Sequence, residues 1–277
     1  MGGNTITSSL VDGVFFIAKN KKEKIMKMKK LFLGLALAGI MTGCGKNESK
    51  EATPAASNDI LADGVLTVAT SADFAPYEYY EGKNIVGIDP DILKALGEKL
   101  GVEIEIKDMD FNNIIASIDS GKADIGAAGL TIDEERLKNV DFTDTYAGSV
   151  QIFLVKDDGE INSVKDLEGK KIGSQLGSIG DDLAQEDYDN VSTFAKYPDA
   201  VLALQNSKVD AILMDKTSAE KFVDANEGLK IMEGPYEPEE YALALGKDQK
   251  DAKEKINAAI KELKEDGTID EIVKKYK

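Results

Sequence analysis

The sequence contains no histidine, no tryptophan and only one cysteine, Cys44, in 277 residues. Without histidine, the chain lacks the usual general base of enzymes and the commonest metal ligand. A single cysteine excludes a disulfide or a thiolate metal site within the chain. We expect no catalytic residues, no metal, no cofactor and no enzyme activity.

Arginine is almost as scarce, because Arg136 is the only one among the 34 lysines and arginines. The guanidinium is a rigid fork of donors that binds a carboxylate through two hydrogen bonds, which lysine cannot reproduce. The alternative to a ligand clamp is a surface ion pair with Glu134 or Asp141. The glycine and hydroxyl residues just before it, in 128–131 (AGLT), favour the clamp.

The chain carries a formal net charge of −17 and is long enough for two domains. Nucleic-acid binding requires clustered lysine and arginine, so this acidity argues against it. So acidic a protein should be soluble and should not adhere electrostatically to anionic lipid. We expect a monomer.

The N-terminal segment has the features of a secretory signal. Lys27, Lys29 and Lys30 precede an apolar run at 31–41, which ends shortly before Cys44. This run is much shorter than the roughly 20 residues of a transmembrane helix, and the pattern is typical of a signal peptide. Its ending on cysteine resembles a bacterial lipoprotein signal, which predicts lipidation of Cys44 and a location on the outer side of the cell membrane.

Three segments are therefore expected before the folded part. Residues 1–25 fit no signal pattern, and we expect translation to begin at Met26 or Met28. Residues 26–43 would be the signal peptide. Residues 44–59, rich in Ser, Ala, Lys and Glu, would be a disordered tether.

Strand and helix patterns alternate through the rest of the chain. Short β-branched or alternating runs predict strands at 66–70, 102–106, 123–127, 171–174 and 211–214. Helical spacing of apolar residues predicts helices at 89–100 with Asp89 as the cap, at 114–118, from 181 onward, and twice within 251–276. This alternation predicts an α/β fold with mainly parallel sheets.

Three stretches that end predicted strands carry suitable chemistry for a ligand, which in such sheets binds beyond the carboxyl ends of strands. They are 71–77, 128–131 followed by Arg136, and 177–180 paired with Asp215. Together they fit a zwitterion. Arg136 and the N–H groups of Thr131 and the Ser178–Ile179 turn can bind a carboxylate. Asp215 can bind an ammonium, with the Thr131 hydroxyl and the Gly129 carbonyl as further acceptors.

Each of these features alone has another explanation. An aspartate that ends a strand, such as Asp215, is more often a cap or turn residue. The glycines at 173, 177 and 180 are similar to a phosphate loop, but they lack its Gly-Lys-Ser/Thr ending. Phe74 and Phe111 are by default core residues. The order and spacing of the whole set support a ligand site.

The chain resembles the solute-binding proteins of polar amino-acid ABC importers, which include the glutamine, histidine and lysine-arginine-ornithine binders. The likeness covers about residues 61–277, and the matching stretches are 69–78 (ATSADFAPYE), 87–91 (GIDPD), 128–136 (AGLTIDEER), 140–144 (VDFTD), 165–170 (KDLEGK), 210–215 (DAILMD) and 265–276 (EDGTIDEIVKKY).

This resemblance implies a two-lobed periplasmic-binding-protein-like fold of type II with two hinge crossovers, near Ser149 and Tyr241. One lobe would hold 60–148 plus 242–277, and the other 149–241. Arg136 would bind the α-carboxylate and Asp215 the α-ammonium, while Phe74 and Phe111 sandwich the ligand's stem. The full set of ligand-binding residues expected is Arg136, Asp215, Thr131, Gly129, Leu130, Ser178, Ile179, Phe74, Phe111, Ser71, Asp73 and Gln175.

One departure from the family concerns specificity. Glutamine and basic amino-acid binders carry an aspartate at the position of Ser71, where it reads the ligand side chain. Here the acid stands at Asp73, on the same side of an extended strand, and the sequence leaves open whether it reaches the ligand. We favour a polar or cationic L-amino acid.

The predicted function is capture of an extracellular amino acid by closure of two lobes and delivery to the permease subunits of an ABC importer. Two alternatives remain. Some relatives on this fold are dehydratases, but that chemistry needs a positioned acid or base that the sequence does not single out. A sensor ectodomain would need a signalling partner.

Overall fold

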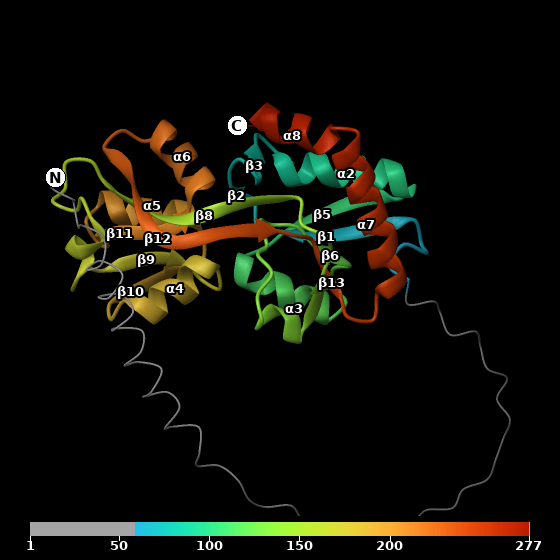
Figure 1. The fold of residues 1–277 in the computed structure, drawn as a ribbon, viewed down its shortest axis with the longest axis horizontal. Coiled ribbons are helices and arrows are strands. Elements are labelled where there is room, and N and C mark those ends of the chain that lie inside the picture. Colours follow the sequence, from blue (N-terminus) through green and yellow to red (C-terminus); the bar gives the residue numbers. More distant parts are fainter. Residues whose placement is uncertain (1–58, 277) are drawn as a thin grey trace, which may run out of the picture. The chain divides into compact units, whose positions relative to one another are not determined.

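The computed structural model describes residues 59–276, drawn in colour in Figure 1. The predictions for the translation start, the signal peptide, the tether and lipidation at Cys44 lie outside these residues. Within 59–276, no helix combines the length and the apolar character needed to cross a membrane.

The first lobe is built on a five-stranded sheet with the order β5-β1-β6-β13-β7. Its strands are β1 (Val65–Thr70), β5 (Glu103–Asp108), β6 (Ile125–Gly126), β7 (Val140–Phe142) and β13 (Ala244–Gly246). A small sheet beside it contains β2 (Asp73–Phe74), β3 (Glu78–Glu81) and β4 (Asn84–Val86). The helical segments are α2 (Ile88–Leu100), η1 (Phe111–Asn113), α3 (Ile114–Asp119), η2 (Arg136–Lys138), α7 (Lys250–Glu265) and α8 (Thr268–Tyr276).

The second lobe has a sheet of the order β10-β9-β11-β8-β12. Its strands are β8 (Ala147–Lys156), β9 (Ile172–Gln175), β10 (Val191–Phe194), β11 (Ala211–Asp215) and β12 (Leu229–Tyr241). The helical segments are η3 (Val164–Leu167), α4 (Ile179–Asp187), α5 (Tyr197–Gln205) and α6 (Lys216–Ala225).

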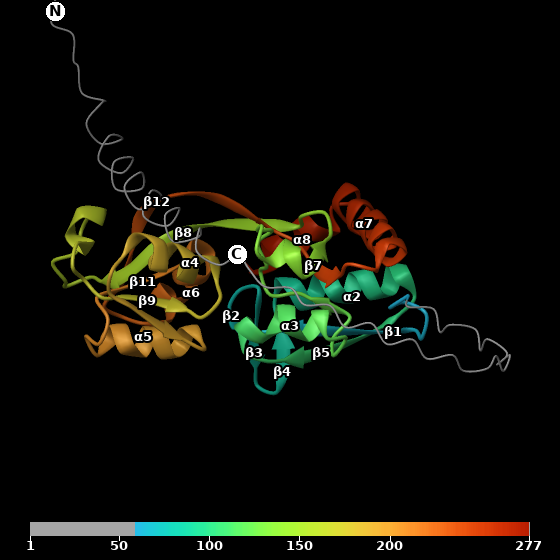
Figure 2. The ribbon, with the colours of Figure 1, turned by 90° about the horizontal axis from the view of Figure 1, so that it is seen from below.

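Two long strands connect the lobes. β8 and β12 pair antiparallel along their length, from Leu229 opposite Lys156 to Tyr241 opposite Ala147, with a register shift between Glu233 and Pro238. In Figures 1 and 2 this pair runs from the β9–β11 sheet toward the β1–β6 sheet. The chain thus enters the second lobe along β8 and returns along β12, which is the two-lobed arrangement expected.

Both sheets are mixed rather than mainly parallel, which corrects that part of the predicted fold. In the first, β1 pairs parallel with β5 and β6, while β13 pairs antiparallel with β6 and β7. In the second, β9 pairs parallel with β10 and β11, while β8 pairs antiparallel with β11 and β12. In the second sheet the antiparallel pairings involve the crossing strands β8 and β12 themselves. In the first sheet they involve β13, which follows the crossing strand β12 directly, without a helix between them.

The amphipathic helices predicted from spacing are present and pack as expected. α7 buries a single stripe against the core of the first lobe: Ala252, Ile256, Ala259, Ile260 and Leu263. α2 begins differently from the prediction. Its cap position is Gly87 rather than Asp89, which is buried. Only glycine fits there, because φ is 136° and a Cβ would lie 2.1 Å from the Tyr77 carbonyl oxygen.

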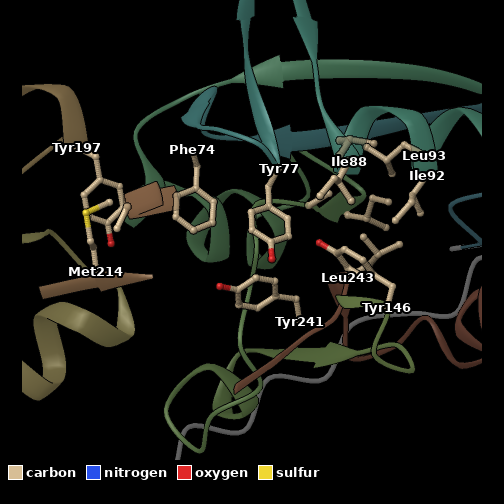
Figure 3. Close-up of a cluster of buried hydrophobic side chains, with 14 of the residues drawn as sticks. Phe74, Tyr77, Ile88, Ile92, Leu93, Tyr146, Tyr197, Met214, Tyr241 and Leu243 are labelled. Atoms are coloured by element: carbon tan, nitrogen blue, oxygen red, sulfur yellow. The ribbon is translucent and has the colours of Figure 1, made fainter. Parts of the chain in front are cut away.

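A row of aromatic rings continues the core from one lobe to the other (Figure 3). Phe74 stacks on Tyr77 at 5.3 Å between ring centroids and on Tyr197, the first residue of α5, at 5.8 Å. Tyr77 meets Tyr241 edge-on at 5.1 Å. Because Phe74 belongs to the first lobe and Tyr197 to the second, these rings meet only when the lobes are close together.

Candidate ligand-binding site

A small pocket lies between the two lobes and is lined by residues of both. The first lobe contributes Phe74, Phe111, Ala128, Gly129, Thr131 and Arg136. The second lobe, with its crossing strands, contributes Gln151, Gln175, Ser178, Ile179, Tyr197, Asp215 and Glu239.

Nine of the predicted site residues line this pocket: Arg136, Asp215, Thr131, Gly129, Ser178, Ile179, Phe74, Phe111 and Gln175. The other three, Leu130, Ser71 and Asp73, do not line it. Leu130 is fully buried in the core of the first lobe. Ser71 and Asp73 bond to each other, through the Ser71 hydroxyl and an Asp73 carboxylate oxygen at 2.8 Å.

Arg136 is held by its neighbours with part of its donor set unused. Nε pairs with Asp133 at 3.0 Å, while the two terminal nitrogens donate to the carbonyls of Thr131 at 2.8 Å and Gly177 at 3.1 Å. A guanidinium has five N–H donors, so these contacts leave two, one on each terminal nitrogen. The Phe111 ring lies 5.5 Å from the guanidinium carbon.

The surface ion pair considered for Arg136 is not what the structure shows. Its partner is Asp133 rather than Glu134 or Asp141, and only 8% of the residue is exposed. Burial lowers the pKa of Arg136, partly offset by Asp133. A buried arginine that faces a pocket with two free donors can bind a carboxylate bidentately.

Two acids face this arginine across the pocket. Asp215 accepts hydrogen bonds from the Tyr241 hydroxyl and from Gln151 at 3.1 Å. Burial, and then the nearby Glu239, raise the pKa of Asp215 to about 7. Glu239 accepts a 2.6 Å hydrogen bond from the Thr131 hydroxyl, and burial raises its pKa as well. Two carboxyl groups that face the same pocket, one of which raises the pKa of the other, favour a cation between them.

The start of α4 borders the pocket at Ser178 and Ile179. The Ser178 hydroxyl caps the helix by accepting a hydrogen bond from the N–H of Asp181, and the backbone N–H of Ser178 donates to the carbonyl of Gln175. The first N–H groups of a helix have no partner within it, so the N–H of Ile179 is the one at this turn that can assist a ligand carboxylate.

Asp73 connects the lobes instead of facing the pocket. One carboxylate oxygen accepts from the backbone N–H of Tyr197 at 2.9 Å and from Gln175 at 3.3 Å, both in the second lobe. The other accepts from Ser71. Near this contact, Lys196 approaches Asp108 at 3.8 Å. Asp73 thus fastens the first lobe to the N-terminus of α5.

Four lining residues were missed from the sequence: Ala128, Gln151, Tyr197 and Glu239. Gln151 stands in the apolar strand β8 and Glu239 in the acidic end of β12, so both lie on the crossing strands. In the sequence, the amide of Gln151 directly before the apolar run 152–155 was a usable signal of a functional residue. Nothing in the sequence distinguishes Glu239 from Glu237 or Glu240. In residues 59–276, no group of His, Cys, Asp or Glu could hold a metal ion.

The model of the bacterial extracellular solute-binding proteins, family 3, matches residues 66–277. The chain belongs to this family. It is 36% identical over 259 residues to the arginine-binding extracellular protein ArtP of Bacillus subtilis (strain 168), covering 90% of this chain and 98% of that protein.

Solved structures agree with this family 3 assignment. An ancestral arginine-binding protein bound to glutamine is 40% identical, with a TM-score of 0.73, covering 77% of this chain and 97% of that one. The binding protein AbpA of Streptococcus pneumoniae, bound to L-arginine, is 35% identical with a TM-score of 0.74, covering 78% and 96%. As a family 3 member, the chain is a solute-binding protein and not an enzyme, and its fold is the two-lobed type II fold.

Proposed function

We propose that this solute-binding protein captures a cationic L-amino acid, with arginine the first candidate, for an ABC importer. The excess of acid in the pocket carries this proposal. The lining contains one cation, Arg136, and two acids, Asp215 and Glu239. Arginine brings one carboxylate and two positive groups, so it balances this set, whereas glutamine leaves one carboxyl group unpaired.

The orientation proposed follows from the donors and acceptors in the pocket. Arg136 and the N–H of Ile179 bind the α-carboxylate. Asp215 binds the α-ammonium, with Thr131 and Gly129 as further acceptors. Phe74 and Phe111 lie against the ligand stem. A buried charge without a partner costs several kcal/mol, so each charge of the ligand requires one of these groups.

The remaining predicted residues support the pocket in this proposal and do not bind a charged group of the ligand. Gln175 and Asp73 hold the lobes together, Ser71 orients Asp73, and Leu130 packs beneath the turn that carries Gly129. Lobe one is taken as 60–148 plus 242–277 and lobe two as 149–241. The full set of ligand partners exists only when the lobes are closed, so the ligand shifts the population toward the closed form, which the permease receives.

Lipidation at Cys44 would keep the protein at the outer face of the membrane. One acyl chain binds a membrane only marginally, whereas two or more anchor it stably. We expect Cys44→Ser protein to be released or left unprocessed while it still binds its ligand. Palmitate labelling that persists in Cys44→Ser would contradict the anchor.

The test compares L-arginine with L-citrulline, which has nearly the same shape without the charge, by calorimetry at pH 7.5. We expect arginine to bind at least about tenfold more tightly, which corresponds to about 1.4 kcal/mol. Glu239→Gln should shrink that preference, whereas Glu240→Gln, on the neighbouring residue, should leave it unchanged. Equal affinity for arginine, citrulline and glutamine would refute a cationic specificity.

A further inference from the structure

Two acidic side chains of the first lobe are buried without any cation. Glu78, the first residue of β3, is 0% exposed, and Asp89, the second residue of α2, is 1% exposed. Neither takes part in an ion pair within residues 59–276. Lys275 of α8, which packs on α2, bonds Asp91 instead, and Lys99 of α2 itself bonds Glu262.

Among the four carboxylate oxygens of Glu78 and Asp89, one accepts hydrogen bonds and three do not. One oxygen of Asp89 accepts from the N–H of Gly129 at 3.2 Å and from the Tyr146 hydroxyl at 2.8 Å. Its other oxygen and both oxygens of Glu78 have no donor among the described residues. Two ionised carboxylates cannot satisfy one another, because neither has a proton to donate.

The two carboxyl groups lie close together, because the backbone N–H of Asp89 donates to the carbonyl of Tyr77, the residue before Glu78, at 3.0 Å. A single proton between them supplies the missing hydrogen-bond donor, because a protonated Glu78 can donate to the unpartnered Asp89 oxygen. We infer that Glu78 and Asp89 share one proton, and that this carboxyl–carboxylate pair positions Gly129 in the wall of the ligand pocket.

The surroundings indicate which residue holds the proton. Asp89 already accepts two hydrogen bonds, which stabilise its charged form, whereas Glu78 accepts none. Burial and the neighbouring Asp89 raise the pKa of Glu78 well above its usual value, and burial raises the pKa of Asp89 to about 6. The other titratable groups that face the pair are all acids or phenols: Tyr77, Tyr146, Asp73 and Asp215.

The ionised Asp89 then holds two parts of the ligand machinery at once. Gly129 lines the pocket with φ +54°, a backbone conformation that glycine adopts readily. Tyr146 immediately precedes the crossing strand β8, and its N–H donates to the carbonyl of Tyr241 at the end of β12. Glu78 and Asp89 are therefore positioning residues: they act through the Gly129 turn and the crossing strands and do not touch the ligand.

Infrared spectroscopy of the ligand-free wild-type protein tests the shared proton directly. We expect a carboxylic-acid C=O band at pH 7 that is lost in Glu78→Gln and kept in Glu81→Gln, which changes an exposed glutamate of the same strand. Asp215→Asn identifies any contribution from the pocket acid. Absence of the band from the wild type, or its survival in Glu78→Gln, would overturn the inference. This measurement needs no ligand, so it stays decisive if arginine does not bind.

Binding of L-arginine tests the positioning role. Glu78→Gln keeps a donor to Asp89 and cannot ionise, so we expect its Kd within about threefold of wild type and nearly constant from pH 8 to 9, where Asp215 is already ionised. Wild type should lose affinity relative to this variant once the pH is high enough to ionise Glu78, whose pKa is raised. Glu78→Leu, which fills the space without a donor, should weaken binding more than Glu78→Gln. Equal losses in the two variants would show that the glutamate only fills space.

Discussion

The raised pKa of Asp215 makes the binding of an amino acid sensitive to pH in a calculable way. Asp215 is buried beside Glu239, and its pKa rises to about 7. If it binds the ligand ammonium, the carboxylate must be ionised in the complex. Below pH 7, binding must therefore first remove a proton from the free protein.

The size of the effect follows from this value. With a pKa of about 7, roughly one molecule in a hundred has Asp215 ionised at pH 5. The apparent Kd should then rise about tenfold per pH unit below 7, or about 100-fold at pH 5, which is about 2.7 kcal/mol. Above pH 8 the Kd should no longer depend on Asp215.

The assay is calorimetry of L-arginine binding from pH 5 to 8.5, in buffers of different ionisation enthalpy to count released protons. We expect nearly one proton to be released per arginine at pH 6 and very few at pH 8.5. Asp215→Asn should bind weakly with a flat profile. A wild-type Kd that is constant from pH 5 to 8, with no proton release, would refute the role given to Asp215.

The raised pKa of Asp215 also makes the free energy of unfolding of the ligand-free protein depend on pH. A carboxyl group whose pKa is higher in the folded state binds a proton that unfolding releases, so the free energy of unfolding falls as pH rises between about 3.8 and 7. Asp215→Asn should therefore unfold at higher denaturant concentration than wild type at pH 8, by about 1–3 kcal/mol, although it has lost binding. A less stable variant at pH 8 would contradict this reasoning.

Three further substitutions test separate contacts. Arg136→Lys keeps the positive charge but cannot form two parallel hydrogen bonds to a carboxylate, and breaking a buried charged contact costs about 3–5 kcal/mol. The Kd for arginine, measured by calorimetry, should therefore rise at least about 100-fold. A change below threefold would show that Arg136 has only a structural role. Asp73→Ala removes two hydrogen bonds between the lobes, each worth about 1 kcal/mol, so it should weaken the binding of arginine and of citrulline by the same factor of about 30. A loss confined to arginine would mean that Asp73 contacts the ligand side chain. Gly129→Ala would place a Cβ 2.7 Å from the Phe74 ring and should lower both affinity and melting temperature; unchanged values would show that the turn yields easily.

Much of the fold was predictable because its signals are local. The stripe of α7 and the buried run of β11 are set by spacing and composition over a few residues. The mixed direction of the sheets was not predictable in this way, since it depends on where β8 and β12 return after crossing between the lobes. Asp89 was assigned as a cap for a similar reason: an aspartate near a helix start has the same sequence pattern whether it caps the helix or is buried.

In the candidate site, too, features set by local sequence were predictable and features set by distant contacts were not. Arg136 was singled out by its scarcity and by the turn before it, and the structure places it in the pocket with nine-tenths of its surface buried. Asp73 could not be assigned, because its partners Tyr197 and Gln175 are more than 100 residues away. Glu239 reaches the pocket only because β12 crosses beside Thr131, a contact that no local pattern encodes.

In the sequence, the second lobe is inserted between two segments of the first lobe, and this has a consequence for how the chain folds. β13, α7 and α8 come last in the sequence, yet they complete the first sheet and pack on α2; Lys275, for example, bonds Asp91 across 184 positions. The second lobe is continuous between its crossing strands and can form from its own residues. Contacts between distant segments form slowly, because the loop between them must close first. Completion of the first lobe must wait until the C-terminus has been synthesised, which keeps a protein of an extracellular family incompletely folded while it is still being made.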